Sequence, residues 1–330
     1  MGAEYGEGWM RKPATSTALD TPQQRIRSEL LGVLAVLLAC ASWGTSGIFV
    51  KAIVAETGVT ALALAFWRDL TTFTVLLVSL ALLRPAWLRI HRRDLPWVAL
   101  MGLSLGAFHV CWNLAVTING AAVATVQQAA MPAIVAVVAR LVWREPLTGT
   151  KIAAIALTFI GTAFVSGLDV LGQTAWTPLG VASGLGTAVT YAAWTLFGKK
   201  NRQEYNPFTT LTYAFGFAAL VLLPLQPLTP QPFPIAPAAL LWFGGLILVA
   251  TLVSFSSYTF ALGRIQASVV SILAMSEIAF VAVYAYLLLD ERLTASQVLG
   301  AVLVIGGVLL LSRPRARAAG GPKPPRRSPP

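Results

Sequence analysis

Long apolar stretches alternate with short polar or charged segments along almost the whole chain. Each stretch approaches the roughly 20 apolar residues that an α-helix needs to cross the ~30 Å hydrocarbon layer of a bilayer. The pattern therefore predicts an all-α polytopic membrane protein with ten transmembrane helices. The predicted spans are residues 30–54, 59–83, 96–116, 121–143, 152–168, 177–197, 209–225, 236–262, 267–289 and 298–311.

Lysine and arginine residues lie almost entirely on one side of these predicted spans. They precede the first span, follow the second, fourth, sixth and eighth, and recur in the tail after the last. The other side carries only Lys51 and Arg292, both near predicted helix ends. Because Lys and Arg favour cytoplasmic segments, we predict a multi-pass protein of the cell (inner) membrane with both termini cytoplasmic and an even number of spans.

The composition agrees with the membrane interpretation. Hydrophobic residues make up 56% and charged residues 11% of the 330 residues, against about 25% charged residues in ordinary soluble domains. The net charge of +11 does not indicate nucleic acid binding, because the basic residues lie between apolar stretches and not on one folded face. Cys40 and Cys111 fall inside apolar stretches, where a thiol packs as a small hydrophobe. We predict no disulfide framework, no metal and no cofactor.

Polar tails flank the predicted helical region. Residues 1–29 contain acidic side chains, which argues against a cleaved signal or transit peptide, and we interpret them as a cytosolic N-terminal tail. Residues 313–330 are basic, rich in proline and free of acidic residues, so we expect a disordered cytosolic tail. Membrane lipids are its expected partners. The tail either attaches to anionic headgroups or serves only as a topology anchor.

The second half of the chain repeats the first. With an offset of 146 residues, WREPLT at 143–148 aligns with LDERLT at 289–294, and residues 121–166 share 14 identities in 46 positions with residues 267–312. An offset of 148 residues aligns Trp43 with Tyr191 and Lys51 with Lys199. We therefore predict two five-helix repeats, residues 30–168 and 177–312.

Five spans in each repeat make the two repeats enter the membrane from opposite sides. Inverted repeats are typical of secondary transporters, because two similar halves can exchange outward-open and inward-open shapes around a site near the midplane. The repeat therefore favours transport of a small molecule by alternating access.

The paired motifs WREPLT and LDERLT end the fourth and ninth spans, a span containing glycine follows each, and Arg68 lies in the second span. On these residues the chain resembles the drug/metabolite transporter superfamily, of the EamA-like ten-span type. The resemblance implies export of amino acids or related metabolites through a cavity lined by spans one, three, four, six, eight and nine. Sugar-phosphate or nucleotide-sugar carriage is the alternative. A Glu-Pro pair common in spans four and nine of the family is divided here, as Met131-Pro132 and Glu277-Ile278.

Two ionisable side chains fall near the middle of predicted spans, where a charge is costly and usually marks a transport pathway or a buried pair. We expect Glu277, in span nine, to bind substrate or a proton, or to make a structural hydrogen bond. Arg68 needs a partner, and the adjacent Asp69 points about 100° away on a helix. Another helix must then help, with Glu277 as one candidate. We interpret Arg68 as a gating or structural charge.

Polar and aromatic residues in the spans that face the cavity in the family are further candidates. His109 and Asn113 are four residues apart and share one face of span three, although a lone histidine more often packs than binds. Pocket walls are commonly aromatic with a few polar groups, yet aromatic residues also simply pack. The predicted substrate-binding residues are Trp43, His109, Asn113, Gln127, Gln128, Tyr191 and Glu277.

An enzymatic alternative rests on one short motif. Gly44-Thr45-Ser46-Gly47 resembles the GxSG of rhomboid-type intramembrane serine proteases, with Ser46 as nucleophile and His109 as base. Nothing else of that family's pattern accompanies it, and there is no HExxH or phosphate-binding loop. We predict that the protein is not an enzyme, and a homodimer is left open.

Overall fold

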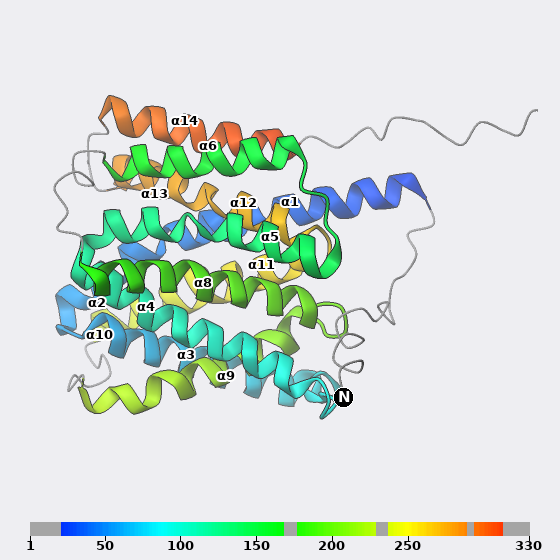
Figure 1. Ribbon diagram of the computed structural model, residues 1–330. Coiled ribbons are helices and arrows are strands. Elements are labelled where there is room, and N and C mark those ends of the chain that lie inside the picture. The colour runs from blue at the N-terminus through cyan, green and yellow to red at the C-terminus, as the bar shows by residue number, and fades with distance from the viewer. Residues whose placement is uncertain (1–20, 168–176, 229–236, 289–293, 313–330) are drawn as a thin grey trace, which may run out of the picture.

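The computed structural model describes residues 21–167, 177–228, 237–288 and 294–312. These residues form helices and connecting turns without a strand, and the helices run side by side across the molecule (Figure 1). The helices are α1 (Pro22–Gly44), α2 (Ser46–Thr57), α3 (Ala61–Leu83), η2 (Pro85–Leu88), α4 (Leu95–Gln128), α5 (Met131–Trp143), α6 (Gly149–Ser166), α8 (Pro178–Asn201), α9 (Pro207–Leu222), η3 (Leu223–Leu228), α10 (Pro237–Ile247), η4 (Leu248–Val253), α11 (Ser254–Leu262), α12 (Ala267–Ala274), α13 (Ser276–Leu288) and α14 (Ala295–Ser312).

These helices correspond to the predicted spans. Seven described segments are long and apolar enough to cross a membrane. One of them, Leu95–Trp143, covers the third and fourth predicted spans. Pro178–Asn201 and the shorter Ala295–Leu311 lie at the sixth and tenth. The all-α, multi-pass membrane architecture is confirmed.

Short polar side chains start several of the helices. A threonine or asparagine side chain accepts a hydrogen bond from the backbone N–H three residues later, which satisfies one of the amides left free at a helix start. In α1 the capping box is complete, because the Gln24 side chain in turn accepts from the amide of Thr21. The capping residues are Thr21, Thr60, Thr148, Thr177 and Asn206.

Contacts between helices follow the repeat. α4 packs on α8, and α1 packs on α11. The repeat relates these two pairs. α4 and α8 contain spans three and six, and the counterparts of these spans in the other repeat are span eight, which contains α11, and span one, which contains α1. α6 packs on α14 along one edge of the molecule, and α3 packs on α9 along the opposite edge, so counterparts also meet (Figure 1). This exchange is the two-fold pattern of two inverted five-helix repeats.

Glycines allow the closest of these contacts. A Cβ atom on Gly102 of α4 would lie 2.5 Å from the carbonyl oxygen of Ala214 in α9. A Cβ atom on Gly161 of α6 would lie 2.7 Å from the carbonyl oxygen of Gly300 in α14. Backbones approach this closely only where a side chain is absent, as is common between membrane helices.

Three of the spans are interrupted, which the apolar pattern did not predict. Span one bends at Thr45, between α1 and α2; span four is broken at Ala129 and Ala130, between α4 and α5; span nine is broken at Met275, between α12 and α13. Residues 129 and 275 are separated by the 146-residue offset of the repeat. Span eight is continuous, but the short π-helix η4 lies between α10 and α11 within it.

The two corresponding breaks have different physical causes. In span four, Pro132 stands at the start of α5, and a proline ring cannot accommodate a continuing helix on its N-terminal side. Span nine has no proline at this point. Instead the Cys40 thiol of α1 donates to carbonyl oxygens beside the break, that of Ala274 at 3.4 Å and that of Leu273 at 3.7 Å.

A single glycine joins spans three and four. Gly120 has φ 79° and ψ 158°, a conformation open essentially only to glycine. Near the start of α4, the carbonyl of Trp97 accepts from Asn201 at the end of α8. Glu145, just beyond α5, lies beside the start of α12 at the same end of the molecule. The chain thus crosses the molecule in α4 and returns after Gly120.

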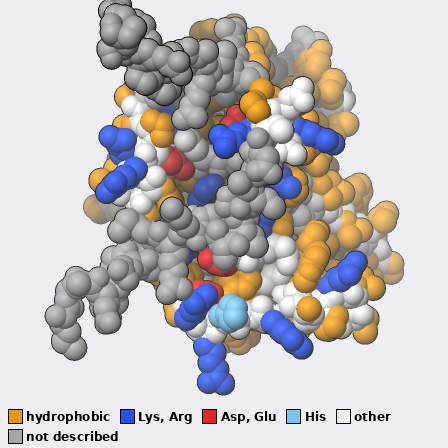
Figure 2. All heavy atoms as spheres, turned by 90° about the vertical axis from the view of Figure 1, so that its right-hand side faces the viewer, with side chains coloured by type: hydrophobic (Ala, Val, Ile, Leu, Met, Phe, Trp, Pro, Cys, Tyr) orange, Lys and Arg blue, Asp and Glu red, His pale blue; other side chains and the backbone are white. Residues whose placement is uncertain are grey.

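The start of α1 and the end of α14 lie at the same end of the molecule (Figure 1). Lys and Arg side chains gather on this face (Figure 2). We call it the terminus-bearing end. Its relation to the cytoplasm remains a prediction from the distribution of basic residues.

Candidate functional site

Glu277 stands at the break in span nine. It is the second residue of α13, where the partial positive charge of a helix N-terminus favours a carboxylate. The residue is half-buried, and its side chain makes no hydrogen bond or ion pair with the described residues. It lies close enough to Cys40 and Tyr191 to interact electrostatically with both. A partly exposed carboxyl group without a hydrogen-bonding or ionic partner among the described residues therefore stands where α1, α8 and α13 meet.

An aromatic cluster adjoins this carboxyl group. Trp194 stacks on Tyr258 with 4.9 Å between ring centroids, Trp43 lies 5.2 Å from Tyr258, and Tyr191 lies 5.7 Å from Trp194. The hydroxyls of Tyr258 and Thr195 are hydrogen-bonded at 2.9 Å. These rings come from spans one, six and eight and are buried. Trp43 and Tyr191, predicted as a matched pair, belong to the same cluster, and in this conformation they pack on other rings.

Amide side chains lie near the other break. The Asn119 amide donates to Gln127 Oε1 at 3.0 Å and to the carbonyl of Gly180 at 2.7 Å, so it ties span four to the start of α8. Gln127 also donates to Gly180, at 3.3 Å. Gln128 is half-buried and makes no hydrogen bond with the described residues. Of the two predicted glutamines, Gln128 has the freer side chain.

The side chain of Asn113, a predicted substrate-binding residue, is hydrogen-bonded within its own helix. Its side-chain amide donates to the carbonyl of His109 in its own helix at 2.7 Å. The amide nitrogen is therefore engaged locally, as often happens when a polar side chain lies within a helix.

Arg68, Asp69 and His109 form a buried polar triad between spans two and three. His109 Nδ1 lies 2.9 Å from Asp69 Oδ2, Arg68 Nε lies 3.5 Å from Asp69 Oδ1, and an Arg68 Nη2 contact reaches His109 Nε2. A guanidinium can only donate, so the ring accepts at Nε2, and a neutral ring then carries its proton at Nδ1, beside Asp69. Span three supplies the second helix that Arg68 requires. The partners of Arg68 are Asp69 and His109, and not the candidate Glu277.

The triad also bears on two other expectations for His109. Both ring nitrogens face protein groups and the residue is 3% exposed, so in this conformation it holds α3 to α4. No contact joins it to Ser46 among the described residues. The arrangement therefore does not support the protease alternative, in which His109 would act as the base for Ser46.

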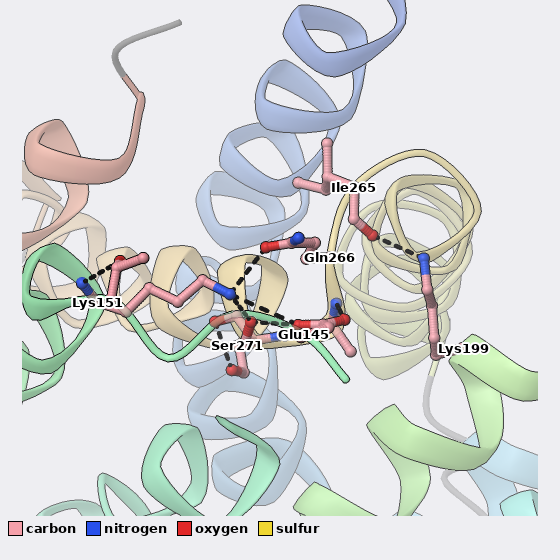
Figure 3. A network of polar contacts seen from close by, with 9 residues as sticks. Glu145, Lys151, Lys199, Ile265, Gln266 and Ser271 are labelled. Atoms are coloured by element: carbon pink, nitrogen blue, oxygen red, sulfur yellow. Dashed lines mark hydrogen bonds and ion pairs between the residues drawn. The ribbon is translucent and has the colours of Figure 1, made fainter. Parts of the chain in front are cut away.

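Glu145, from the motif WREPLT, is the centre of a second polar network (Figure 3). Its Oε1 accepts from the amide of Ala267 at 2.9 Å, and its Oε2 accepts from the amide of Ser268 at 3.3 Å and from the Ser268 hydroxyl. Lys151 Nζ lies 3.7 Å from Glu145 Oε2 and donates to Ser268 Oγ at 2.6 Å. A carboxylate of the first repeat thus caps α12 of the second.

Within the described ranges, no group of three or more His, Cys, Asp or Glu side chains is placed to hold a metal ion. The chemistry of the interior is therefore that of single charges, amides and aromatic rings.

Comparison with known proteins identifies the family. The EamA-like transporter family profile matches residues 30–167 and again residues 178–313. The chain belongs to the EamA-like transporter family. EamA-like transporters are membrane carriers, so the protein is a membrane transporter and not an enzyme, and the resemblance seen in the motifs is confirmed.

Relatives of this EamA-like transporter match along most of its length. YicL of Salmonella typhimurium, described as an uncharacterized inner membrane transporter, is 26% identical over 87% of this chain and 98% of its own. YwfM of Bacillus subtilis, an uncharacterized transporter, is 27% identical over 84% of this chain and 93% of its own. A crystal structure with 16% identity superposes with a TM-score of 0.71 over 84% of this chain and 95% of that one, which shows that the fold is shared.

The structure thus places the predicted residues of the EamA-like transporter in three separate sets. Glu277, Tyr191 and Trp43 are brought together at one site. His109 belongs to the triad with Arg68, and Gln127 to the amide cluster. Sequence reasoning used Glu145 only as part of the aligned motif WREPLT, and it did not single out Lys151 or Asn119 as site residues. A glutamate stands at the same position of both motifs, as Glu145 and Glu291, and this was the one signal in the sequence that could have drawn attention to Glu145.

Proposed function

We propose that this transporter exports amino acids or closely related zwitterionic metabolites across the cell (inner) membrane by alternating access. The observation that carries the proposal is Glu277, a partly exposed carboxyl group at a helix break that has no hydrogen-bonding or ionic partner in the described part of the chain. Broken helices near the midplane are where carriers of this general architecture bind substrates and ions. A substrate ammonium group would supply the missing charge partner.

The aromatic cluster supports an organic substrate. Tyr191 lies beside Glu277, and its ring continues into Trp194 and Tyr258. A cation near the face of such rings gains further attraction. A small amino acid could thus be held by its ammonium at Glu277 and by its side chain against aromatic surface.

The break in span four suits the other end of a zwitterion. α5 begins at Met131 without a side-chain cap and without an acidic residue in its first turn. Such a helix N-terminus attracts a carboxylate. Gln128 precedes the break with an uncommitted amide. One break carries a carboxylate and its counterpart does not, and this difference favours a ligand with opposite charges at its two ends.

Sugar-phosphate or nucleotide-sugar carriage is the weaker alternative. A doubly charged phosphate is normally held by at least two cations. Arg68 is the basic side chain at mid-span among the described residues, and Asp69 and His109 occupy it. An anion carrier would need to take Arg68 from this triad.

Transport by purified protein in liposomes tests the proposal. Labelled neutral amino acids should be moved by the wild type, and Glu277→Gln should lower transport by roughly tenfold or more, because a charge-assisted hydrogen bond is lost. Glu277 has a matched control in Glu56, an exposed residue near the end of α2, whose change to Gln should leave transport unaltered.

The proposal fails if the liposomes move only phosphorylated compounds, or if Glu277→Gln transports amino acids at the wild-type rate. Measuring flux at two pH values with the same variant separates substrate binding from proton binding. Loss of pH dependence with retained flux would assign Glu277 to a proton.

The direction of transport and the cytoplasmic placement of both termini belong to the same proposal. They are supported by the basic residues on the terminus-bearing end and by the inner-membrane description of YicL. Comparing flux in right-side-out and inside-out vesicles tests the direction.

A further inference from the structure

The Glu145 network lies at the terminus-bearing end, away from the break that carries Glu277. We propose that Glu145 and Lys151 of the first repeat, bound to the start of α12 in the second, form a gate that closes this end of the transport path. Lys199 holds the turn before α12 within the second repeat, and the contacts of Glu145 and Lys151 separate each time the carrier opens toward this end. The inference rests on the alternating access of the proposed function and does not depend on the identity of the substrate.

The first argument is that the network joins the two repeats. Glu145 follows span four, whereas Ala267 and Ser268 begin span nine. The N-cap residue of α12, Gln266, makes no capping hydrogen bond with its own helix. The carboxylate of Glu145 therefore satisfies amides of α12 that would otherwise lack partners. Moving one repeat away from the other removes the cap.

Two lysines hold the turn before α12 from either side. Lys151, at the start of α6, donates to Gln266 Oε1 at 2.8 Å as well as to Ser268. Lys199, near the end of α8, donates to the carbonyls of Leu262 and Ile265, each at 2.8 Å (Figure 3). The turn between α11 and α12 is thereby fixed to spans five and six.

The two charged side chains that join the repeats are shielded from water. Lys151 is 0% and Glu145 is 7% exposed. Buried charges depend on each other and on their hydrogen bonds, because breaking such a pair leaves an uncompensated charge unless water enters. When this end opens, water enters and solvates the separated charges, which lowers the free-energy cost of separating them.

The equivalent positions at the opposite end are arranged differently. Lys51, which aligns with Lys199, is exposed and makes no hydrogen bond or ion pair with the described residues. Gln297, which aligns with Lys151, accepts at 2.9 Å from the amide of Thr294 in its own helix. Among the described residues, Lys51 makes no bond to another span and Gln297 makes none to the other repeat. The bonds of Lys151 and Lys199 are therefore not repeated by these counterparts, while Glu291, which aligns with Glu145, lies outside the described residues.

A side-specific labelling experiment tests the gate. Ser271 is fully buried in α12, one turn beyond Ser268. A Ser271→Cys reporter, in a full-length protein with Cys40→Ser and Cys111→Ser, is treated in liposomes with a membrane-impermeant thiol reagent from each side. An exposed Glu204→Cys marker, on the turn after α8, identifies the terminus-bearing side.

Glu145→Gln should raise the labelling rate of the reporter from the terminus-bearing side by roughly tenfold, the change in an equilibrium produced by losing one charge-assisted hydrogen bond. Labelling from the other side should not rise. Lys151→Gln keeps the carboxylate cap and should act in the same direction, which provides a second variant if Glu145→Gln does not fold.

Asn206→Ala is the matched control. It removes the cap of α9 at the same end, but the bond from Thr209 to Asn206 lies within one repeat. It should reduce thermal stability without changing side-specific labelling. Equal labelling of wild type and both gate variants, or an increase from both sides, would overturn the gate and leave only a structural cap. Because labelling needs no substrate, this result is independent of the amino-acid transport assay.

Discussion

The buried triad of Arg68, Asp69 and His109 offers a quantitative test of how this membrane protein holds charge. The perturbation is Asp69→Asn, which keeps the shape of the side chain but removes its charge. Asp69 is 0% exposed, and its oxygens stand 2.9 Å from His109 and 3.5 Å from Arg68. The change leaves a guanidinium buried between helices without an anion.

Removing one partner of a buried ion pair typically costs about 3–5 kcal/mol of the free energy of unfolding. The Asp69 oxygens lack a well-aligned hydrogen bond among the described residues, so we expect the lower end, about 3 kcal/mol. Arg68→Met removes the stranded charge. The double variant should therefore be more stable than Asp69→Asn alone, with a coupling energy of about 1–3 kcal/mol.

The assay is reversible unfolding or thermal denaturation in one detergent for the wild type, both single variants and the double variant. Arg68→Met combined with Glu277→Gln is the control pair and should be additive within about 0.5 kcal/mol. Additive behaviour of Arg68 with Asp69, or strong coupling of Arg68 with Glu277, would refute the assignment of partners.

Further outcomes are expected for topology and packing. Single cysteines at Glu56 and Glu204, both exposed, should react with an impermeant reagent from opposite sides of the membrane, with Glu56 on the outside of the cell, and the reverse pattern would overturn the orientation. Gly102→Ala should cost about 1–3 kcal/mol of stability in detergent, because the new methyl group meets the backbone of α9. Gly47→Ala, with nothing within 4 Å, should be neutral or slightly stabilising, and equal costs would refute the packing argument.

The positions of the helices could be predicted from the sequence because hydrocarbon length and apolar content determine them directly. The break at Met275 could not, since residues 267–289 contain no proline or glycine to mark it and the bond from Cys40 comes from a span more than two hundred residues earlier. The partner of Arg68 could not be predicted from the sequence either, because it depends on which helices become neighbours. The repeat supplied the one long-range constraint, and it correctly related the two halves.

Within the candidate site, sequence reasoning found Glu277 because a carboxylate inside an apolar span is conspicuous. It treated Glu145 only as an alignment marker, since a glutamate at a helix end usually faces water. The structure buries Glu145 against α12, and this burial follows from contact between repeats, which no local pattern contains.

The glycine between spans three and four has a mechanical consequence. Gly120 is the sole non-helical residue inside α4, so these two spans share a fixed end and cannot slide apart there. Span four is broken again at Ala129 and Ala130, so its rigid part beyond the break is α5, which has 13 residues and a length of about 20 Å at 1.5 Å per residue. If α5 swings about this break, a tilt of about 10° moves its far end by roughly 3 Å over that length. The end of span four beside Glu145 can thus shift while the end at Gly120 stays joined to span three.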